Sequence, residues 1–233
     1  MTRHLGPFSS STLMPRCRTW PGHTTYASGT HPHHALSRLE LKRLLMHSWT
    51  RTVVSIASGG GVGLAPAMND VVSLRPLAVS DAREMANVLS SPRLYVFTGG
   101  EPPDEAELRR RYAVQTRGCS TDGSQRWLNL IVALEPGGQA IGYVQATIPQ
   151  SSGPTEIAWV IGEPWQGRGY ARTAAELLAD ELRRMGVVDV VAHIHPEHVA
   201  SQRVATHLAM SPTGVVVDGE TRWEGSLSCA DKQ

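Results

Sequence analysis

The stretch Gly162-Glu163-Pro164-Trp165-Gln166-Gly167-Arg168-Gly169-Tyr170-Ala171 decides the fold of this chain. It follows a strand predicted over Thr155–Ile161 and opens directly onto a helix predicted over Ala171–Met185. The first amides of a helix have no internal partner, and the helix dipole adds partial positive charge at that end. Gly167 and Gly169 let the backbone approach a ligand closely. The stretch therefore predicts a cradle for an anion such as a pyrophosphate.

Two arginines strengthen this interpretation. Arg168 and Arg172 can add charge-assisted contacts to an anion held by the loop. The glycine spacing also resembles a dinucleotide-binding turn, but Arg172 stands where the third glycine of that fingerprint belongs. The preceding elements are predicted as antiparallel hairpins rather than a strand–helix–strand unit, which does not favour a dinucleotide site.

The segments on either side of the loop predict an α/β fold. The predicted strands are Val71–Leu77, Trp127–Leu134, Ala140–Ile148, Thr155–Ile161, Val187–His195, Val215–Val217 and Thr221–Leu227, and the predicted helices begin at Ser80–Asp81, Asp104, Ala171 and Val199. Ser80, Asp81 and Asp104 are the expected N-caps, and Gly186 is the expected C-cap of the third helix. This order of elements is typical of an α/β domain with a mixed sheet.

Composition divides the chain into a polar extension, one domain and a short tail. From Met1 to Ala67 there are seven basic residues and one acid, and Ser, Thr, Gly and Pro are frequent. Such a chain buries too little apolar surface to offset the entropy of ordering. We expect residues 1–67 to be disordered or poorly ordered, residues 68–228 to form the domain, and residues 229–233 to form a tail. A transit peptide is a second interpretation of the extension, although no clear amphipathic Arg helix opens it.

Charge and cysteine content exclude several classes of protein. The formal net charge is +1, which gives no reason to expect nucleic acid or an anionic membrane as a partner. No stretch approaches the roughly 20 apolar residues that a spanning helix needs. The three cysteines are scattered, so they favour neither a disulfide framework nor a zinc site. We expect a cytoplasmic protein without a metal.

The loop resembles a motif of a known superfamily. Residues Gln166 to Ala171 are similar to the Gln/Arg-x-x-Gly-x-Gly/Ala motif of the GNAT N-acetyltransferases, in the same strand–loop–helix context. Segments starting at Leu74, Thr155 and His195 resemble the branch that includes the ribosomal-protein-alanine N-acetyltransferases. Together these matches span Val71 to Trp223, and four segments in the family's order are hard to explain by chance.

This resemblance implies a GNAT fold and an acyl-CoA-dependent N-acyltransferase. The mixed, mostly antiparallel central sheet would be flanked by helices and would splay between its fourth and fifth strands, where the thioester of acetyl-CoA would lie. Amides of the loop would hold the CoA pyrophosphate, and the end of the fourth strand would pair with the pantetheine arm. The residues implied in acetyl-CoA binding are Val160, Ile161, Gln166, Gly167, Arg168, Gly169, Tyr170, Ala171, Arg172, His198 and Ser201.

Three positions depart from the family's pattern. His198 stands where relatives usually have Asn, and Ala209 stands where they have Gly. The tyrosine that serves as general acid in some members is also absent, since residues 205–207 are Ala, Thr and His. The leaving thiolate would then depend on solvent, on His207, or on no specific group.

Two residues are candidates for the general base that an attacking amine needs. Glu156 lies in the fourth strand and matches a glutamate often given this role; its alternative is a solvated or paired carboxylate. His193 has an ordinary pKa near neutral; its alternative is a packed strand histidine. His193 and His195 point to one face, but no third metal ligand stands at useful spacing.

The sequence leaves the acceptor open between a protein N-terminus and a small amine, in a monomer or homodimer. The run Arg109-Arg110-Arg111 could bind an acidic substrate, but it is more typical of a solvated helix face. Tyr143, Trp159 and Trp165 could line an acceptor pocket, although aromatic residues at such positions are more often core. A non-catalytic acyl-CoA-binding sensor or scaffold is the alternative function.

Overall fold

The computed structural model describes residues 71–228. The extension predicted over residues 1–67 and the tail predicted over residues 229–233 lie outside the described residues. The exact domain boundaries therefore stay a prediction. None of the helices between residues 71 and 228 has the length and apolar character that a membrane-spanning helix requires.

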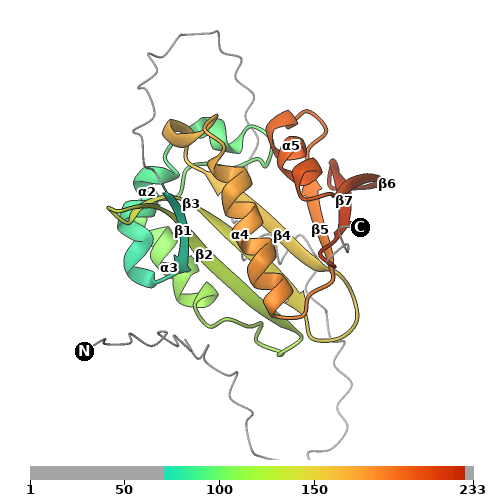
Figure 1. Ribbon diagram of the computed structural model, residues 1–233. Helices are drawn as coiled ribbons and strands as arrows, with labels where there is room; N and C mark the ends of the chain where they lie inside the picture. The colour runs from blue at the N-terminus through green and yellow to red at the C-terminus, as the bar shows by residue number, and fades with distance from the viewer. Residues whose placement is uncertain (1–70, 229–233) are drawn as a thin grey trace, which may run out of the picture. The chain divides into compact units, whose positions relative to one another are not determined.

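A seven-stranded sheet forms the centre of the described domain (Figure 1). The strands are β1 (Val71–Pro76), β2 (Gln125–Glu135), β3 (Gln139–Pro149), β4 (Thr155–Ile161), β5 (Asp189–Ile194), β6 (Ser211–Val217) and β7 (Glu220–Ser226). Their order across the sheet is β1-β2-β3-β4-β5-β7-β6, and each pair is antiparallel except β4 with β5. The predicted α/β fold with a mixed, mostly antiparallel sheet is confirmed.

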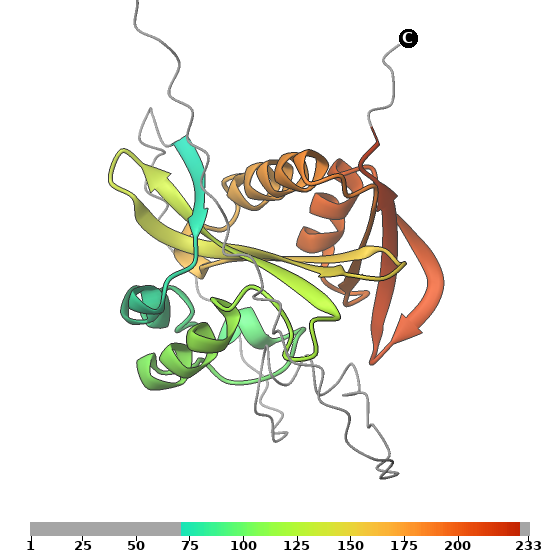
Figure 2. The ribbon, with the colours of Figure 1, turned by 90° about the horizontal axis from the view of Figure 1, so that it is seen from below.

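Helices cover both faces of this sheet. They are α2 (Ala82–Val88), α3 (Glu105–Gln115), α4 (Tyr170–Arg184) and α5 (Val199–His207), with single 3₁₀ turns at Val79–Asp81 (η1), Pro92–Tyr95 (η2) and Glu163–Trp165 (η3). Seen along the sheet, α4 and α5 lie on one side and α2 and α3 on the other (Figure 2). The sheet is therefore the middle of three layers, and each of its faces is packed.

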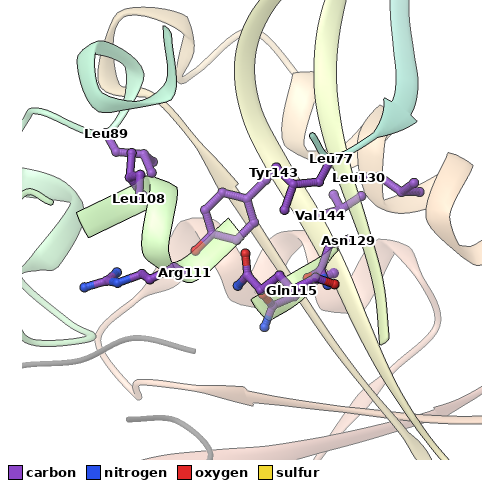
Figure 3. Close-up of a pocket in the computed structure, with 10 residues that line it drawn as sticks. Leu77, Leu89, Leu108, Arg111, Gln115, Asn129, Leu130, Tyr143 and Val144 are labelled. Atoms are coloured by element: carbon purple, nitrogen blue, oxygen red, sulfur yellow. The ribbon is translucent and has the colours of Figure 1, made fainter. Parts of the chain in front are cut away.

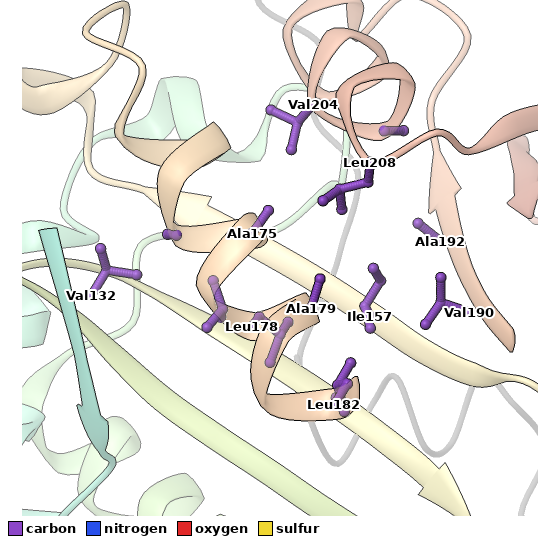
Figure 4. Close-up of a cluster of buried hydrophobic side chains, with 14 of the residues drawn as sticks. Val132, Ile157, Ala175, Leu178, Ala179, Leu182, Val190, Ala192, Val204 and Leu208 are labelled. Carbon is purple, nitrogen blue, oxygen red and sulfur yellow. The ribbon is translucent and has the colours of Figure 1, made fainter. Parts of the chain in front are cut away.

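The larger core lies under α4 (Figure 4). The apolar side chains of α4 recur at helical spacing, so Leu178 and Leu182 point to the sheet and are fully buried. They pack with Ile157 of β4 and Val190 of β5. A second core lies on the opposite face, where Met85 of α2 and its neighbours cover the sheet. Two separate cores fix the two helical layers on β4 and its neighbours.

Two of the predicted N-caps lie directly before their helices, but only one makes the expected side-chain hydrogen bond. Asp104 caps α3, because its carboxylate accepts a hydrogen bond from the Glu107 amide at 2.7 Å. Asp81 makes no such cap on α2. Its carboxylate accepts from the Ala78 amide at 2.8 Å and from the Arg75 guanidinium at 2.9 Å. These contacts join η1 to β1, so α2 begins at Ala82, directly after Asp81 as predicted, but without a hydrogen bond from the Asp81 side chain to the first turn.

Two helices end in the same motif with different residues at the left-handed position. After α4, Gly186 has φ 81°, and the Val187 amide bonds the Leu182 carbonyl. After α5, Ala209 has φ 57°, and the Met210 amide bonds the Ala205 carbonyl. Both are Schellman endings, which normally take glycine. The sequence departure at Ala209 therefore places a side chain in a strained backbone conformation.

Replacing Ala209 by Gly is expected to stabilise the protein. Removing the side chain relieves left-handed strain, but it adds flexibility to the unfolded chain, so the net gain is about 0.5–1 kcal/mol. The melting temperature should rise by about 1–4 °C. Gly186→Ala places alanine in the same motif and should lower the melting temperature. Thermal unfolding of both variants checks this, and a fall with Ala209→Gly would contradict it.

The strand predicted as Val215–Val217 is longer than expected. Observed β6 begins at Ser211, and its register against β7 is irregular between Pro212 and Val216. Proline and glycine at residues 212 and 214 disfavour a strand, which explains the shorter prediction.

The sheet opens between its fourth and fifth strands. β4 and β5 pair at Thr155↔Val190 and Glu156↔Val191, at the start of both strands. Their remaining residues have no pairing with each other within the described part of the chain. The predicted splay is confirmed, and it leaves one edge of β4 facing a gap beyond Glu156.

Candidate functional site

The predicted anion cradle lies at the carboxyl end of β4. Gly167 and Gly169 both have left-handed backbones, with φ of 75° and 83°. Gly169 is the N-cap of α4, and the Thr173 amide donates to its carbonyl at 3.1 Å. A Cβ atom built on either glycine meets nothing within 4 Å. The loop thus turns sharply beside open space, at the positive end of a fifteen-residue helix.

The loop is fastened to the end of β4 by Gln166. Its side-chain amide donates to the Ile161 carbonyl at 2.9 Å. The Val160 carbonyl points to β3, because it lies 2.1 Å from the position that a Cβ on Gly142 would take. Successive carbonyls alternate along a strand, so the Ile161 carbonyl faces the gap. Of the two residues predicted to pair with pantetheine, Ile161 therefore presents its backbone to the gap.

A second attachment joins the loop to the chain after α2. The Glu163 carboxylate accepts from the Ser91 hydroxyl and, at 2.9 Å, from the Arg93 guanidinium. The Ser91 hydrogen bond, followed by Arg93, holds the pKa of Glu163 below its ordinary value. Gly162 packs closely against this segment, since a Cβ there would lie 2.8 Å from the Val88 carbonyl oxygen. These contacts fix the start of the cradle, and they were not predicted because no local pattern marks them.

The predicted residues His198 and Ser201 lie where the loop after β5 leads into α5. His198 is the N-cap of α5, and its Nδ1 accepts a hydrogen bond from the Ser201 amide at 3.0 Å. The ring of Phe97 meets it edge-on, with centroids 4.6 Å apart, and lies 5.2 Å from the ring of His195. The imidazole of His198, one of the departures noted in the sequence, therefore caps the helix. Phe97 was not predicted, because it lies far away in the sequence.

The stability contributed by this cap is expected to depend on pH. Burial lowers the pKa of His198 below its ordinary value, and His195 lowers it further. Below about pH 6.5 the folded chain then binds fewer protons than the unfolded chain, so stability is lost as the pH falls through that value. His198→Asn keeps a cap that does not titrate. Its melting temperature should fall less than that of the unmodified protein between about pH 7.5 and pH 5.5. An equal fall in both proteins would contradict the assignment.

The two predicted base candidates contact each other at the mouth of the gap. His193 Nδ1 lies 3.3 Å from Glu156 Oε1. Glu156 is in the last paired row of β4 and β5, and His193 lies two residues further along β5 on the same face. The His193 side chain is 3% exposed and that of Glu156 is 38% exposed. The carboxylate is the member of the pair that an incoming molecule reaches first.

The remaining candidates have structural contacts elsewhere. His207 Nε2 contacts the Glu176 carboxylate of α4, and Arg172 lies 3.7 Å from the same carboxylate. Trp159 and Trp165 pack against the core, as their alternative interpretation proposed. Within residues 71–228, no group of three or more His, Cys, Asp or Glu side chains could hold a metal ion.

The family of the chain follows from comparison with known proteins. The family model described as an acetyltransferase (GNAT) domain matches residues 72–211. The chain belongs to the GNAT acetyltransferase family. The predicted class of enzyme, an acyl-CoA-dependent acyltransferase, is confirmed by this match. Among curated proteins, none matches the sequence of this GNAT protein.

Solved structures resemble the GNAT protein in fold. The aminoglycoside acetyltransferase AAC(6')-Ib in complex with coenzyme A is 17% identical, with a TM-score of 0.55 over 67% of this chain and 95% of that one. RimJ of Mycobacterium smegmatis, in complex with CoA-disulfide, is 18% identical, with a TM-score of 0.55 over 68% and 84%. A spermidine N-acetyltransferase SpeG chimera from Vibrio cholerae and hSSAT is 19% identical, with a TM-score of 0.53 over 67% and 96%. At these identities the likeness shows the fold alone.

Proposed function

We propose that this GNAT protein transfers the acetyl group of acetyl-CoA to a primary amine, with Glu156 as the general base. The observation that carries the proposal is the contact of Glu156 with the buried His193 at the opening between β4 and β5. Family membership supports acetyl transfer in general, and solved GNAT structures with bound CoA support the donor.

The cradle fits the pyrophosphate of CoA. The space beside Gly167 and Gly169, where a Cβ atom would lie, is open. The amides that begin α4 supply hydrogen-bond donors there. Arg168 is exposed on the loop, where it can add a charge-assisted contact. When bound, acetyl-CoA supplies the thioester. We assign the rest of the acetyl-CoA molecule to the gap-facing backbone of Ile161 and to the cap residues His198 and Ser201.

Glu156 and His193 have different roles in this proposal. An amine must be neutral to attack, and Glu156 takes its proton directly or through water. His193 Nδ1 lies 3.3 Å from the carboxylate. With a proton on Nδ1 the imidazole would fix the orientation of the carboxylate, so we assign His193 as a positioning residue. A bond forms between the amine nitrogen and the acetyl carbon, the carbon–sulfur bond breaks, and the thiolate leaves. Ala205 has no acidic group and His207 contacts the Glu176 carboxylate of α4, so we assign protonation of the thiolate to solvent.

The proposal also concerns the chemical class of the acceptor amine. Segments similar to the ribosomal-protein-alanine N-acetyltransferases support a protein N-terminus. The TM-scores do not separate this branch from the aminoglycoside enzymes, because RimJ and AAC(6')-Ib both give 0.55. A small amine therefore remains the second acceptor class.

The proposal is tested by measuring thiol release from acetyl-CoA with N-terminal peptides, aminoglycosides and polyamines. Amine-dependent release and an acetylated product, identified by mass, are the expected results. Tight acetyl-CoA binding without turnover of any amine would contradict the proposal and favour the sensor or scaffold function.

A further inference from the structure

A small amphipathic cavity lies between α3 and the sheet (Figure 3). It is lined by Leu77, Leu89, Leu108, Arg111, Gln115, Asn129, Leu130, Tyr143, Val144 and Gln145. Its volume is about 40 Å³, enough for about three water molecules or one small polar group. Neither the family resemblance nor the comparisons assign a role to it.

The cavity and the base share one face of the sheet. Asn129, Gln145 and Ala158 stand opposite one another on β2, β3 and β4, and Glu156 lies two residues from Ala158 on the same face. Diagonal neighbours of this kind are about 7–8 Å apart. A molecule with its amine at Glu156 can therefore reach the Gln145 side of the cavity with a short extension.

The lining sets the chemistry of the group that enters. Among these ten described residues, Arg111 alone carries a full charge. Its side chain is 19% exposed and pairs with Glu107. The run of arginines was interpreted as a solvated helix face, which is correct for Arg109 at 52% exposure but wrong for Arg111. The α3 helix turns Arg111 partly toward the sheet, and Figure 3 shows its guanidinium at the end of the side chain away from the Tyr143 ring.

The other polar groups are neutral. The Asn129 side-chain amide donates to the Gln115 carbonyl at 3.3 Å. Burial raises the pKa of Tyr143, so its phenol stays protonated at neutral pH. Leu89 and Leu108 form an apolar wall. The ten described lining residues thus offer amide, hydroxyl and guanidinium groups beside leucines, and none of the ten carries a carboxylate; Glu107, which pairs with Arg111, is not among them.

We propose that this cavity binds an oxygen-bearing, neutral or acidic group of the acceptor, so that the enzyme prefers peptide-like amines over polycations. The inference rests on the proposed function and deepens it. An extended peptide advances about 3.4 Å per residue, so the group in the cavity comes from the second or third residue. A second cation at that place meets Arg111, whereas a carboxylate or amide forms hydrogen bonds.

The test compares three peptides that begin with alanine and carry Glu, Gln or Lys at both the second and third positions. Spermidine serves as a polycation of comparable length. The full-length protein is expected to show kcat/KM in the order Glu, Gln, Lys, with a ratio of Glu to Lys of about tenfold or more, the scale of one charge-assisted hydrogen bond. Spermidine should be no better than the lysine peptide.

Arg111→Gln and Arg109→Gln form a matched pair for this test. Each removes one arginine of α3 that pairs with a glutamate four residues before it. Arg111→Gln should reduce the Glu-to-Lys ratio by about tenfold, while Arg109→Gln should leave the ratio unchanged. The ratio is insensitive to a common loss of folded protein, so it reports specificity.

The possible outcomes separate the two proposals. If peptides are acetylated but lysine is preferred or equal, the cavity assignment is wrong and the acetyltransferase proposal stands. If both arginine variants change the ratio equally, Arg111 has no special role and the assignment is also wrong. If acetyl-CoA binds but no peptide or polyamine is acetylated, the proposed function fails and this inference fails with it.

Discussion

Glu156→Gln is expected to lower kcat by about 10²–10⁴-fold, the usual contribution of a positioned base. The substitution keeps the size of the side chain but removes its ability to take a proton. Acetyl-CoA affinity should be unchanged, because the cradle lies at the far end of β4. Steady-state rates at saturating acetyl-CoA and acceptor, together with calorimetric titration, measure the two effects separately.

Two controls accompany this variant. Glu224 lies on β7, opposite Val191 of β5, and pairs with Arg222. Because Val191 in turn stands opposite Glu156 of β4, Glu224 and Glu156 share one face of the sheet. Glu224→Gln removes the same charge and should leave kcat within about threefold, as expected for an exposed ion pair. His193→Gln should lower kcat by about tenfold, and the double variant with Glu156→Gln should be no slower than Glu156→Gln alone. A Glu156→Gln enzyme with normal kcat would exclude the proposed base.

Gly142→Ala is expected to lower stability by about 3 kcal/mol, at the upper end of the usual cost of overpacking. A Cβ at this position would lie 2.1 Å from the Val160 carbonyl oxygen and 3.0 Å from the Ile161 Cα. These are backbone atoms, so β3 and β4 must separate. The melting temperature should fall by about 6–12 °C. Acetyl-CoA affinity should fall too, since the displaced segment leads into the cradle.

The same hairpin supplies the control. Gly137 lies in the turn between β2 and β3, has ordinary backbone angles, and a Cβ there meets nothing within 4 Å. Gly137→Ala should leave the melting temperature within about 2 °C. Equal melting temperatures for the two variants would show that the close approach of β3 to β4 is not structurally important.

The elements that the sequence predicted well depend on local patterns. The apolar spacing of α4 and the glycines of the cradle act within a few residues, so periodicity and turn chemistry locate them. The contact between Glu156 and His193 could also be predicted in part from the sequence. Each residue was proposed as the base on its own grounds, Glu156 from the family resemblance and His193 from its ordinary pKa near neutral, and the register brings them together.

The contacts that the sequence did not predict join distant segments. Glu163 binds Ser91 and Arg93, which lie 72 and 70 residues away, and no local pattern marks such pairs. Phe97 packs on histidines after β5 for the same reason. Asp81 was an ordinary N-cap candidate, but Arg75 and the Ala78 amide compete for its carboxylate. In each case tertiary contacts decide between local options of similar energy.

The most direct test of the account is calorimetric titration of acetyl-CoA into the full-length protein, beside the Gly169→Trp variant. We expect saturable binding at one site in the unmodified protein. The variant should show no binding, because tryptophan disfavours the left-handed backbone of Gly169 and fills the open space beside it. Circular dichroism confirms that the variant is folded. A folded, unmodified protein that does not bind acetyl-CoA, or a folded variant that binds it equally well, would contradict the assignment of this loop as the cofactor site.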